Sequence, residues 1–184
     1  NGTSGTELKG KKLGIHAFGQ VGRNVARIAK GFGMEVYAFD PYCPTEAIEA
    51  EGVKPVTDIN EMYSTCQYIS LHIPATPETK KSINYKLLKQ MPKGAVLINT
   101  ARKEVIDEEE LVKLMEDRAD FKYISDIKPD NAPVFAEKFE GRYFFTPKKM
   151  GAQTAEANIN AGIAAAKQSV GFLKEGIDKF KVNK

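Results

Sequence analysis

The sequence predicts an α/β domain with a doubly wound parallel sheet, because short apolar runs alternate with segments of helical periodicity along its length. Residues 13–17, 67–73 and 95–99 are mainly apolar runs, typical of parallel strands that helices cover on both faces. The chain has 184 residues, of which 42% are hydrophobic, so it can bury one substantial core with little room for a second. We expect a single domain over residues 1–184, with residues 1–6 as a polar linker into it.

The individual elements follow from these patterns and from turn and capping residues. After the first strand we expect a helix that opens near Val21 and a second strand over residues 35–39. Thr57 and Asp107 each precede an apolar periodic segment and are expected to cap helices. The remaining strands are expected at residues 53–56, 67–73, 95–99, 123–125 and 143–145, and the remaining helices at residues 44–51, 57–66, 79–90, 108–118 and 154–174.

The turn after the first strand carries small residues at the spacing of a phosphate-binding turn. Gly19 lets the backbone approach a pyrophosphate without an intervening Cβ, and Gly22 lets the helix pack closely on the strand. Ala17 stands where such turns usually have their first glycine, which predicts that the turn avoids positive φ there. Gln20 and Val21 open the helix and are expected to offer their backbone N–H groups to the phosphates.

A carboxylate follows the second strand at Asp40, eighteen residues after Gly22. In this position it is expected to bind the ribose hydroxyls of a dinucleotide, and its charge favours NAD over NADP because a 2′-phosphate would meet like charge. The order of strand, turn, helix, strand and carboxylate predicts a Rossmann-like NAD-binding fold. Alternatively, Asp40 does not bind the ribose and is only a turn residue before Pro41.

Composition excludes several other classes of function. The net charge of +3 comes with scattered lysines, which argues against a nucleic-acid partner. We expect no membrane association, because no apolar stretch approaches eighteen residues and no signal peptide is visible. Cys43 and Cys66 lack metal-ligand spacing, so we expect no metal and two free thiols in a reducing cytoplasm.

Polar residues follow four of the expected strands, and the carboxyl ends of parallel strands meet at one edge of a sheet. They lie at residues 72–76, 100–102, 126 and 146–151. The guanidinium of Arg102 directly follows a buried strand and could hold a substrate carboxylate with two hydrogen bonds. The alternative is a surface arginine that pairs with Glu104 or Asp107.

With these segments in place, the chain resembles the coenzyme-binding domain of the D-isomer-specific 2-hydroxyacid dehydrogenase family from Gly5 to its end. The segments that carry the resemblance are residues 5–15, 71–79, 98–108 and 146–151. The resemblance implies that Arg102 binds the 2-oxo acid. It implies cofactor binding by His72, Pro74 and Thr79 on the adenine side, by Thr100, Ala101 and Asp126 near the nicotinamide, and by Gly151.

Two departures from the family pattern concern catalysis. Lys148 follows the Thr-Pro pair where the family has its catalytic histidine, and Asn131 stands where the family has the glutamate that orients it. An imidazole needs a partner that fixes its tautomer, whereas an amine does not. Loss of the glutamate would therefore follow from loss of the histidine. We expect Lys148 to be the acid/base, with Lys149 as the rival, if burial and nearby cations lower its pKa. His16 and His72 lie elsewhere and are interpreted as structural.

The lysine-containing segment also resembles a short branch of the family, the D-3-phosphoglycerate dehydrogenases. That branch implies NAD-dependent oxidation of 3-phosphoglycerate to 3-phosphohydroxypyruvate in serine biosynthesis, by a homodimer joined through the coenzyme domain. The resemblance implies that the family's substrate lobe, which lies mainly before the coenzyme domain, is missing here, and that residues from about 175 are the return to it. The alternatives are another D-2-hydroxyacid dehydrogenase, a glyoxylate or hydroxypyruvate reductase, or a non-catalytic NAD-sensing interaction module.

Overall fold

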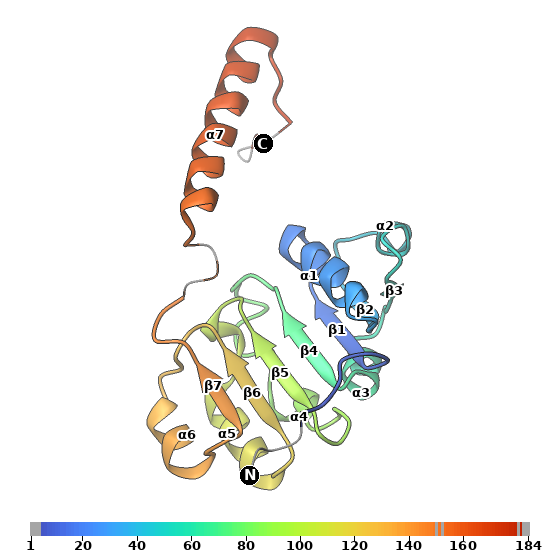
Figure 1. Ribbon diagram of the computed structural model, residues 1–184, viewed down its shortest axis with the longest axis vertical. Coiled ribbons are helices and arrows are strands. Elements are labelled where there is room, and N and C mark those ends of the chain that lie inside the picture. Colours follow the sequence, from blue (N-terminus) through green and yellow to red (C-terminus); the bar gives the residue numbers. More distant parts are fainter. Residues whose placement is uncertain (1–4, 150, 152, 180, 182–184) are drawn as a thin grey trace. The chain divides into compact units, whose positions relative to one another are not determined.

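The computed structural model describes residues 5–149, 151, 153–179 and 181. They divide into two units, residues 1–148 and residues 149–184. Within the described residues, the first unit contains the sheet and most of the helices, and the second contains one long helix (Figure 1). The expected polar linker falls mostly on residues 1–4, and the end of the expected tail on residues 180 and 182–184; both lie outside the described residues.

The sheet of the first unit is parallel throughout and has the strand order β3-β2-β1-β4-β5-β6-β7 (Figure 1). The chain therefore starts in the middle, winds outward to β3, and crosses back over β1 to β4, which is the doubly wound topology that the sequence predicts. The strands are β1 (Lys12–His16), β2 (Glu35–Phe39), β3 (Lys54–Pro55), β4 (Tyr68–Leu71), β5 (Val96–Asn99), β6 (Lys122–Ser125) and β7 (Tyr143–Phe145).

Helices connect these strands, and one more forms the second unit. They are α1 (Gln20–Gly31), α2 (Thr45–Glu49), α3 (Ile59–Thr65), α4 (Tyr85–Leu88), the 3₁₀ turn η1 (Lys103–Val105), α5 (Glu108–Asp117), α6 (Ala132–Lys138) and α7 (Ala155–Glu175). Among the described residues, none of these helices has the length and apolar character needed to span a bilayer.

The core forms two clusters, which correspond to the two faces of the sheet. In the smaller cluster α1 packs on β1 and β2, and in the larger cluster α3 to α6 pack on β4 to β7. Along β6 and β7 the pattern alternates, because Tyr123 and Phe145 pack in the larger cluster whereas Ile124 and Phe144 are 37% and 61% exposed. The first unit taken by itself therefore covers only one face of β6 and β7, although the sequence predicts cover on both.

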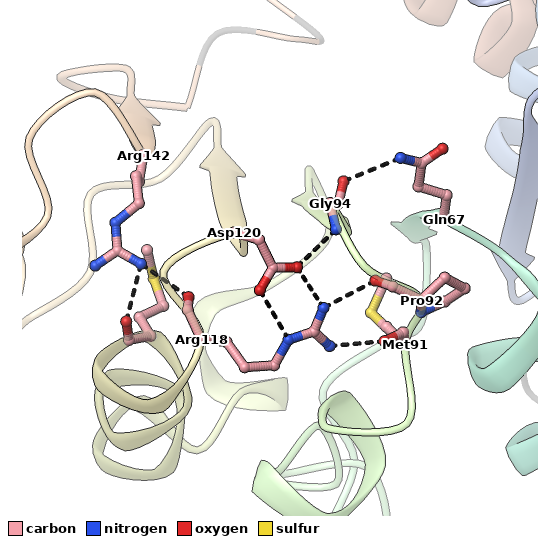
Figure 2. Close-up of polar contacts among 8 residues, drawn as sticks. Gln67, Met91, Pro92, Gly94, Arg118, Asp120 and Arg142 are labelled. Atoms are coloured by element: carbon pink, nitrogen blue, oxygen red, sulfur yellow. Dashed lines mark hydrogen bonds and ion pairs between the residues drawn. The ribbon is translucent and has the colours of Figure 1, made fainter.

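A polar network ties together the loops at the amino-terminal edge of the sheet (Figure 2). Arg118 donates to both oxygens of Asp120, at 3.3 and 2.6 Å, and to the carbonyl oxygens of Met91 and Pro92, at 2.6 and 2.9 Å. Asp120 also accepts the backbone N–H of Gly94 at 2.6 Å. The hydrogen bond from Arg118 is the main cause that lowers the pKa of Asp120 to about 2. This network joins the segments that lead into β5 and β6, away from the edge where ligands bind.

Three helical expectations differ from the structure. Helix α3 is capped by Asp58, whose side chain accepts the N–H of Asn60 at 2.9 Å, so the expectation of a Thr57 cap is wrong by one residue. The helix expected at residues 79–90 is only α4, because residues 77–81 form turns and Ile83 bridges to Ile106 in extended conformation. Helix α6 was not expected. The cap of α5 by Asp107 is confirmed.

Candidate cofactor and active site

The N-terminus of α1 forms a potential anion site. Its first intrahelical hydrogen bond runs from the Arg23 N–H to the Gly19 carbonyl at 2.9 Å, so the N–H groups of Gln20, Val21 and Gly22 have no partner within the helix. The first turn carries no acidic residue, and a Cβ added at Gly19 would meet nothing within 4 Å. Free N–H groups and the positive end of the helix dipole make this a place for a phosphate.

Close packing at Gly22 is confirmed, whereas the expectation for Ala17 is wrong. A Cβ at Gly22 would collide with the carbonyl oxygen of Ala17 and come within 3.1 Å of Ile15 Cγ2. Ala17 has a φ of 77°, so the left-handed conformation is kept although the usual glycine is absent. The turn must reverse directly after β1, and this need overrides the steric preference of alanine, which disfavours that region by about 1–2 kcal/mol.

Asp40 is connected to the phosphate-binding turn. Its Oδ2 accepts the backbone N–H of Phe18 at 2.8 Å, and its Oδ1 accepts the N–H of Tyr42 at 2.9 Å. The bond to Tyr42 is the turn role that the sequence left as an alternative, and the bond to Phe18 holds the turn against the end of β2. Each carboxylate oxygen has a further lone pair, so these bonds leave acceptor capacity for ribose hydroxyls.

The two histidines are held within the fold. His16 Nδ1 lies 3.1 Å from the hydroxyl of Tyr63, and His72 Nε2 lies 3.0 Å from the hydroxyl of Ser70. Burial lowers the pKa of each histidine to about 4, so both are neutral at physiological pH. These contacts support the structural interpretation, and a role of His72 toward the adenine stays a prediction.

The loop over residues 74–79, expected on the adenine side, is held by hydrogen bonds among its own residues. The Thr79 hydroxyl contacts the carbonyl oxygen of Pro74 at 2.5 Å and accepts the N–H of Thr76 at 2.7 Å. Pro74 is exposed at the carboxyl edge of the sheet. Thr79 thus shapes the loop, and direct contact with a cofactor stays a prediction for both residues.

The loop after β5 is shaped by Asn99, which sequence reasoning placed in a motif without a role. The buried amide of Asn99 accepts the N–H of Ala101 at 3.0 Å and donates to the carbonyl oxygen of Arg102 at 2.9 Å. Arg102 is exposed and donates to the Ala101 carbonyl at 2.8 Å. Asp107, one of the carboxylates proposed as its partner, instead pairs with Lys81 at 3.5 Å.

The loop that carries Lys148 is joined to the end of β6. The Thr146 hydroxyl lies within hydrogen-bond distance of two carbonyl oxygens, 2.7 Å from that of Asp126 and 3.0 Å from that of Lys148. The Lys148 side chain is exposed. Asp126 Oδ1 is buried and, among the described residues, has no hydrogen-bond partner. A buried carboxylate oxygen without a donor is costly, so this atom is a strong candidate to receive an N–H group from a ligand.

Lys149 and Gly151 belong to the second unit, and residues 150 and 152 on either side of Gly151 lie outside the described residues. Thr100 also has a contact within the structure and is exposed.

Asn131 has a structural role rather than that of a lost glutamate. Its side-chain amide donates to the Glu108 carbonyl at 2.9 Å, and its backbone N–H donates to Glu108 Oε2 at 3.1 Å. Asp130 also receives both contacts of Lys103 Nζ, at 2.7 and 2.9 Å. A cavity of about 600 Å³ borders this region, and its lining also includes Lys80, Lys81, Lys103, Glu104, Ile106 and Glu109. None of the residues predicted to bind the cofactor lines it, and Lys81, Lys103 and Asp130 in its lining are already in ion pairs.

Comparison with known proteins agrees with this geometry. The family model for the D-isomer specific 2-hydroxyacid dehydrogenase NAD binding domain matches residues 1–139. D-3-phosphoglycerate dehydrogenase from Methanocaldococcus jannaschii is 36% identical over 184 residues, which cover 97% of this chain and 34% of the relative. Glyoxylate reductase from Thermococcus litoralis is 34% identical over 180 residues, covering 98% of this chain and 54% of the relative. The chain thus spans about a third to a half of the length of these relatives.

Among solved structures, NAD⁺-bound 3-phosphoglycerate dehydrogenase from Entamoeba histolytica is 48% identical, with a TM-score of 0.87. The match covers 100% of this chain and 58% of that chain. The apo structure of D-lactate dehydrogenase from Escherichia coli is 30% identical, with a TM-score of 0.76, over 94% of this chain and 54% of that one. Sequence, topology and the geometry of the turn after β1 agree, and the chain belongs to the NAD-binding domain family of the D-isomer specific 2-hydroxyacid dehydrogenases.

Proposed function

We propose that the full-length protein containing this chain oxidises 3-phosphoglycerate to 3-phosphohydroxypyruvate with NAD, as a step of serine biosynthesis. The relatives of highest identity reported above bear the name of this enzyme, and the solved one contains NAD⁺. The observation that carries the proposal is the arrangement at two neighbouring strand ends. Asn99 braces the Arg102 peptide after β5, and Thr146 links the Lys148 backbone to the end of β6.

The residues present fit an NAD molecule. The N–H groups at the start of α1 suit the pyrophosphate, and the spare lone pairs of Asp40 suit the ribose hydroxyls. The unpartnered Asp126 Oδ1 suits the carboxamide N–H of a nicotinamide. Alongside it we propose Thr100, Ala101 and Gly151 as further contacts, and His72, Pro74 and Thr79 on the adenine side.

The catalytic roles follow from charge and position. When bound, NAD would supply the hydride acceptor for C2 of the substrate. Arg102 holds the substrate carboxylate with its guanidinium, which is exposed and makes a single side-chain hydrogen bond among the described residues. The amine of Lys148 accepts the proton of the C2 hydroxyl, so that the C–O bond becomes a carbonyl as the C–H bond breaks.

The test is NAD reduction by the full-length protein, followed at 340 nm, with a panel of D-2-hydroxy acids. We expect 3-phosphoglycerate to give the highest kcat/KM. If glycolate or glycerate wins by tenfold or more, the protein is instead a glyoxylate or hydroxypyruvate reductase, an alternative that the 34% identity to a glyoxylate reductase keeps in view. No turnover of any substrate, with NADH still bound, would favour a non-catalytic NAD-sensing module.

We further propose that residues 1–184 act as one coenzyme domain of a cytoplasmic homodimer, joined through this domain. The single domain is supported by the match of NAD⁺-bound 3-phosphoglycerate dehydrogenase to the whole of this chain, beyond the division at residue 148. Sedimentation equilibrium of the full-length protein tests the dimer. A mass of one chain at micromolar concentration would contradict it.

A further inference from the structure

The loop after β2, which carries the candidate ribose-binding residue, is bordered by a paired cation. The Arg23 guanidinium lies over the ring of Phe18, with Cζ 4.8 Å from the ring centroid. Its Nη1 is 3.3 Å from Glu51 Oε1. The side chains of Arg23 and Glu51 are only 26% and 35% exposed, so the pair is partly shielded from water. Such a pair is screened less than a fully exposed one.

Arg23 and Asp40 border the same residues. Phe18 donates its N–H to the Asp40 carboxylate while its ring contacts the guanidinium. On the other side, Arg23 Nη2 lies 3.4 Å from Cys43 Sγ, and the Cys43 N–H donates to the Asp40 carbonyl at 3.3 Å. The guanidinium is therefore a neighbour of the carboxylate that faces the ribose, although the two groups make no direct bond among the described residues.

The position of Glu51 is fixed by the fold. Its carbonyl oxygen accepts Lys30 Nζ from α1 at 2.7 Å. Gly52, which follows, has a φ of 66°, and a Cβ there would come within 2.5 Å of Lys30 Nζ. The chain therefore turns at Gly52 with Glu51 held against α1, where its carboxylate meets Arg23.

We propose that Glu51 is a second determinant of NAD specificity, which acts by withholding Arg23 from the adenosine 2′ position. A 2′-phosphate selects guanidinium groups, because their planar donors match its oxygens and offset its charge. Asp40 repels this phosphate directly, whereas Glu51 engages the cation that would attract it. Removing Asp40 alone therefore relieves repulsion without supplying attraction. The inference rests on the proposed binding of NAD and does not depend on the proposed substrate.

The test measures NADPH and NADH binding by fluorescence titration of the full-length protein, without substrate. We expect Asp40→Ser to tighten NADPH binding by only a few-fold. Asp40→Ser with Glu51→Gln should tighten it by a further factor of about ten, because the freed guanidinium then meets the phosphate. Adding Arg23→Gln to that pair should abolish the further gain. In the Asp40→Ser background alone, Arg23→Gln should bring no gain in NADPH affinity, because it leaves the Glu51 carboxylate without its cation.

Glu49→Gln is the matched control, because Glu49 is exposed at the end of α2, two residues before Glu51, and loses the same charge without a contact to Arg23 among the described residues. The inference is overturned if Glu49→Gln gives the same gain, or if the gain survives Arg23→Gln. Failure of 3-phosphoglycerate oxidation would reject the proposed substrate and leave these titrations readable, because they depend on cofactor alone.

Discussion

The side-chain amide of Asn99 brackets the peptide that precedes the side chain of Arg102. It accepts the N–H of Ala101 at 3.0 Å and donates to the Arg102 carbonyl at 2.9 Å. The direction of the proposed substrate-binding guanidinium is thus set by the buried last residue of β5, three residues earlier. Because the amide is 1% exposed, water cannot replace these bonds when the side chain is lost.

We expect Asn99→Asp to separate positioning from folding. The aspartate keeps an acceptor for Ala101 but loses the donor to the Arg102 carbonyl, so the loop should lose its fixed direction. In the full-length enzyme, KM for the substrate should rise and kcat/KM should fall by about 10- to 100-fold, the effect expected for misplacement by a fraction of an ångström. The Kd for NADH should change less than threefold.

Ser125→Ala is the matched control for Asn99→Asp. It removes a buried hydroxyl that donates to the Asn99 carbonyl at 3.0 Å, yet leaves both bonds to the Arg102 loop in place. Both variants should lose stability, but only Asn99→Asp should raise KM. Equal effects on KM would mean that Asn99 acts through general stability.

The left-handed conformation of Ala17 predicts that glycine stabilises this position. At a φ of 77°, Ala17→Gly should relieve about 1–2 kcal/mol of steric strain and lose about half of that to the entropy of the unfolded chain. We expect chemical denaturation to show a gain of about 0.5–1 kcal/mol. Ala26→Gly, in the middle of α1, should instead destabilise by about 1 kcal/mol. A loss of stability in Ala17→Gly would contradict the strain.

The Arg118–Asp120 pair predicts a specific window of acid sensitivity. The pKa of Asp120 is lowered from 3.8 to about 2, so the carboxylate stabilises the fold fully above pH 4 and loses this contribution as pH falls from 4 to 2. Arg118→Ala should remove this dependence on pH. It should also lower the free energy of unfolding by about 2–3 kcal/mol at pH 7, because the hydrogen bonds to the carbonyl oxygens of Met91 and Pro92 are lost as well.

The measurement is the free energy of unfolding at several pH values between 2 and 7. Arg27→Ala is the control, since Arg27 is exposed and donates only to Asn24 in the contacts of the described residues. Burial of His16 and His72 also lowers their pKa values, from 6.5 to about 4, and destabilises the fold as pH falls through that higher range. Arg118→Ala should keep the loss between pH 6.5 and 4 and flatten the curve below pH 4. An unchanged slope of the unfolding free energy below pH 4 would show that Asp120 does not cause the acid sensitivity.

The topology and the turn after β1 could be predicted because each depends on local pattern. Apolar runs identified the main strands, and the small residue at position 22 identified the close approach of α1 to the Ala17 carbonyl. The conformation of Ala17 could not be predicted, because a tertiary need for reversal overrides the preference of the residue. The short α4 was missed for a similar reason, since the bridge between Ile83 and Ile106 competes with the helical pattern.

At the candidate site, sequence reasoning named charged residues but missed those that hold them. Glu108 accepts the backbone N–H of Asn131, 23 residues away, and no spacing rule reveals such a partner. Asn99 bonds to backbone groups only two and three residues along, but which ones depends on the folded loop. The one available signal was a polar residue at the end of an otherwise apolar strand, as at Asn99. Likewise, the Thr79 hydroxyl has backbone partners that only the folded loop supplies.

The isolated chain is expected to bind NADH weakly and to turn over nothing. The turn after β1 and Asp40 are intact, but closure between two lobes is what excludes water and aligns the hydride transfer in such enzymes. Titration of the isolated chain should show binding, while the full-length protein alone reduces NAD with substrate. Comparable turnover by both would contradict this prediction.

The dehydrogenase and the non-catalytic NAD-sensing module differ most in what they predict for Lys148. If its amine accepts the C2 hydroxyl proton, Lys148→Ala in the full-length enzyme should lower kcat by roughly 10²–10⁴, the usual contribution of a positioned base. The Kd for NADH should hardly change, because the residue is proposed to face the substrate.

Two further variants make the Lys148 prediction specific. Lys149→Ala tests the neighbouring amine and should keep most of the activity. Lys148→His should recover little, because the Asn131 amide donates to the Glu108 carbonyl and offers no anionic partner to an imidazolium. Adding Asn131→Glu should raise the activity of Lys148→His, provided the loop tolerates the loss of that bond. A wild-type rate in Lys148→Ala would reject the assignment and turn attention to Lys149 or Lys128 as the base.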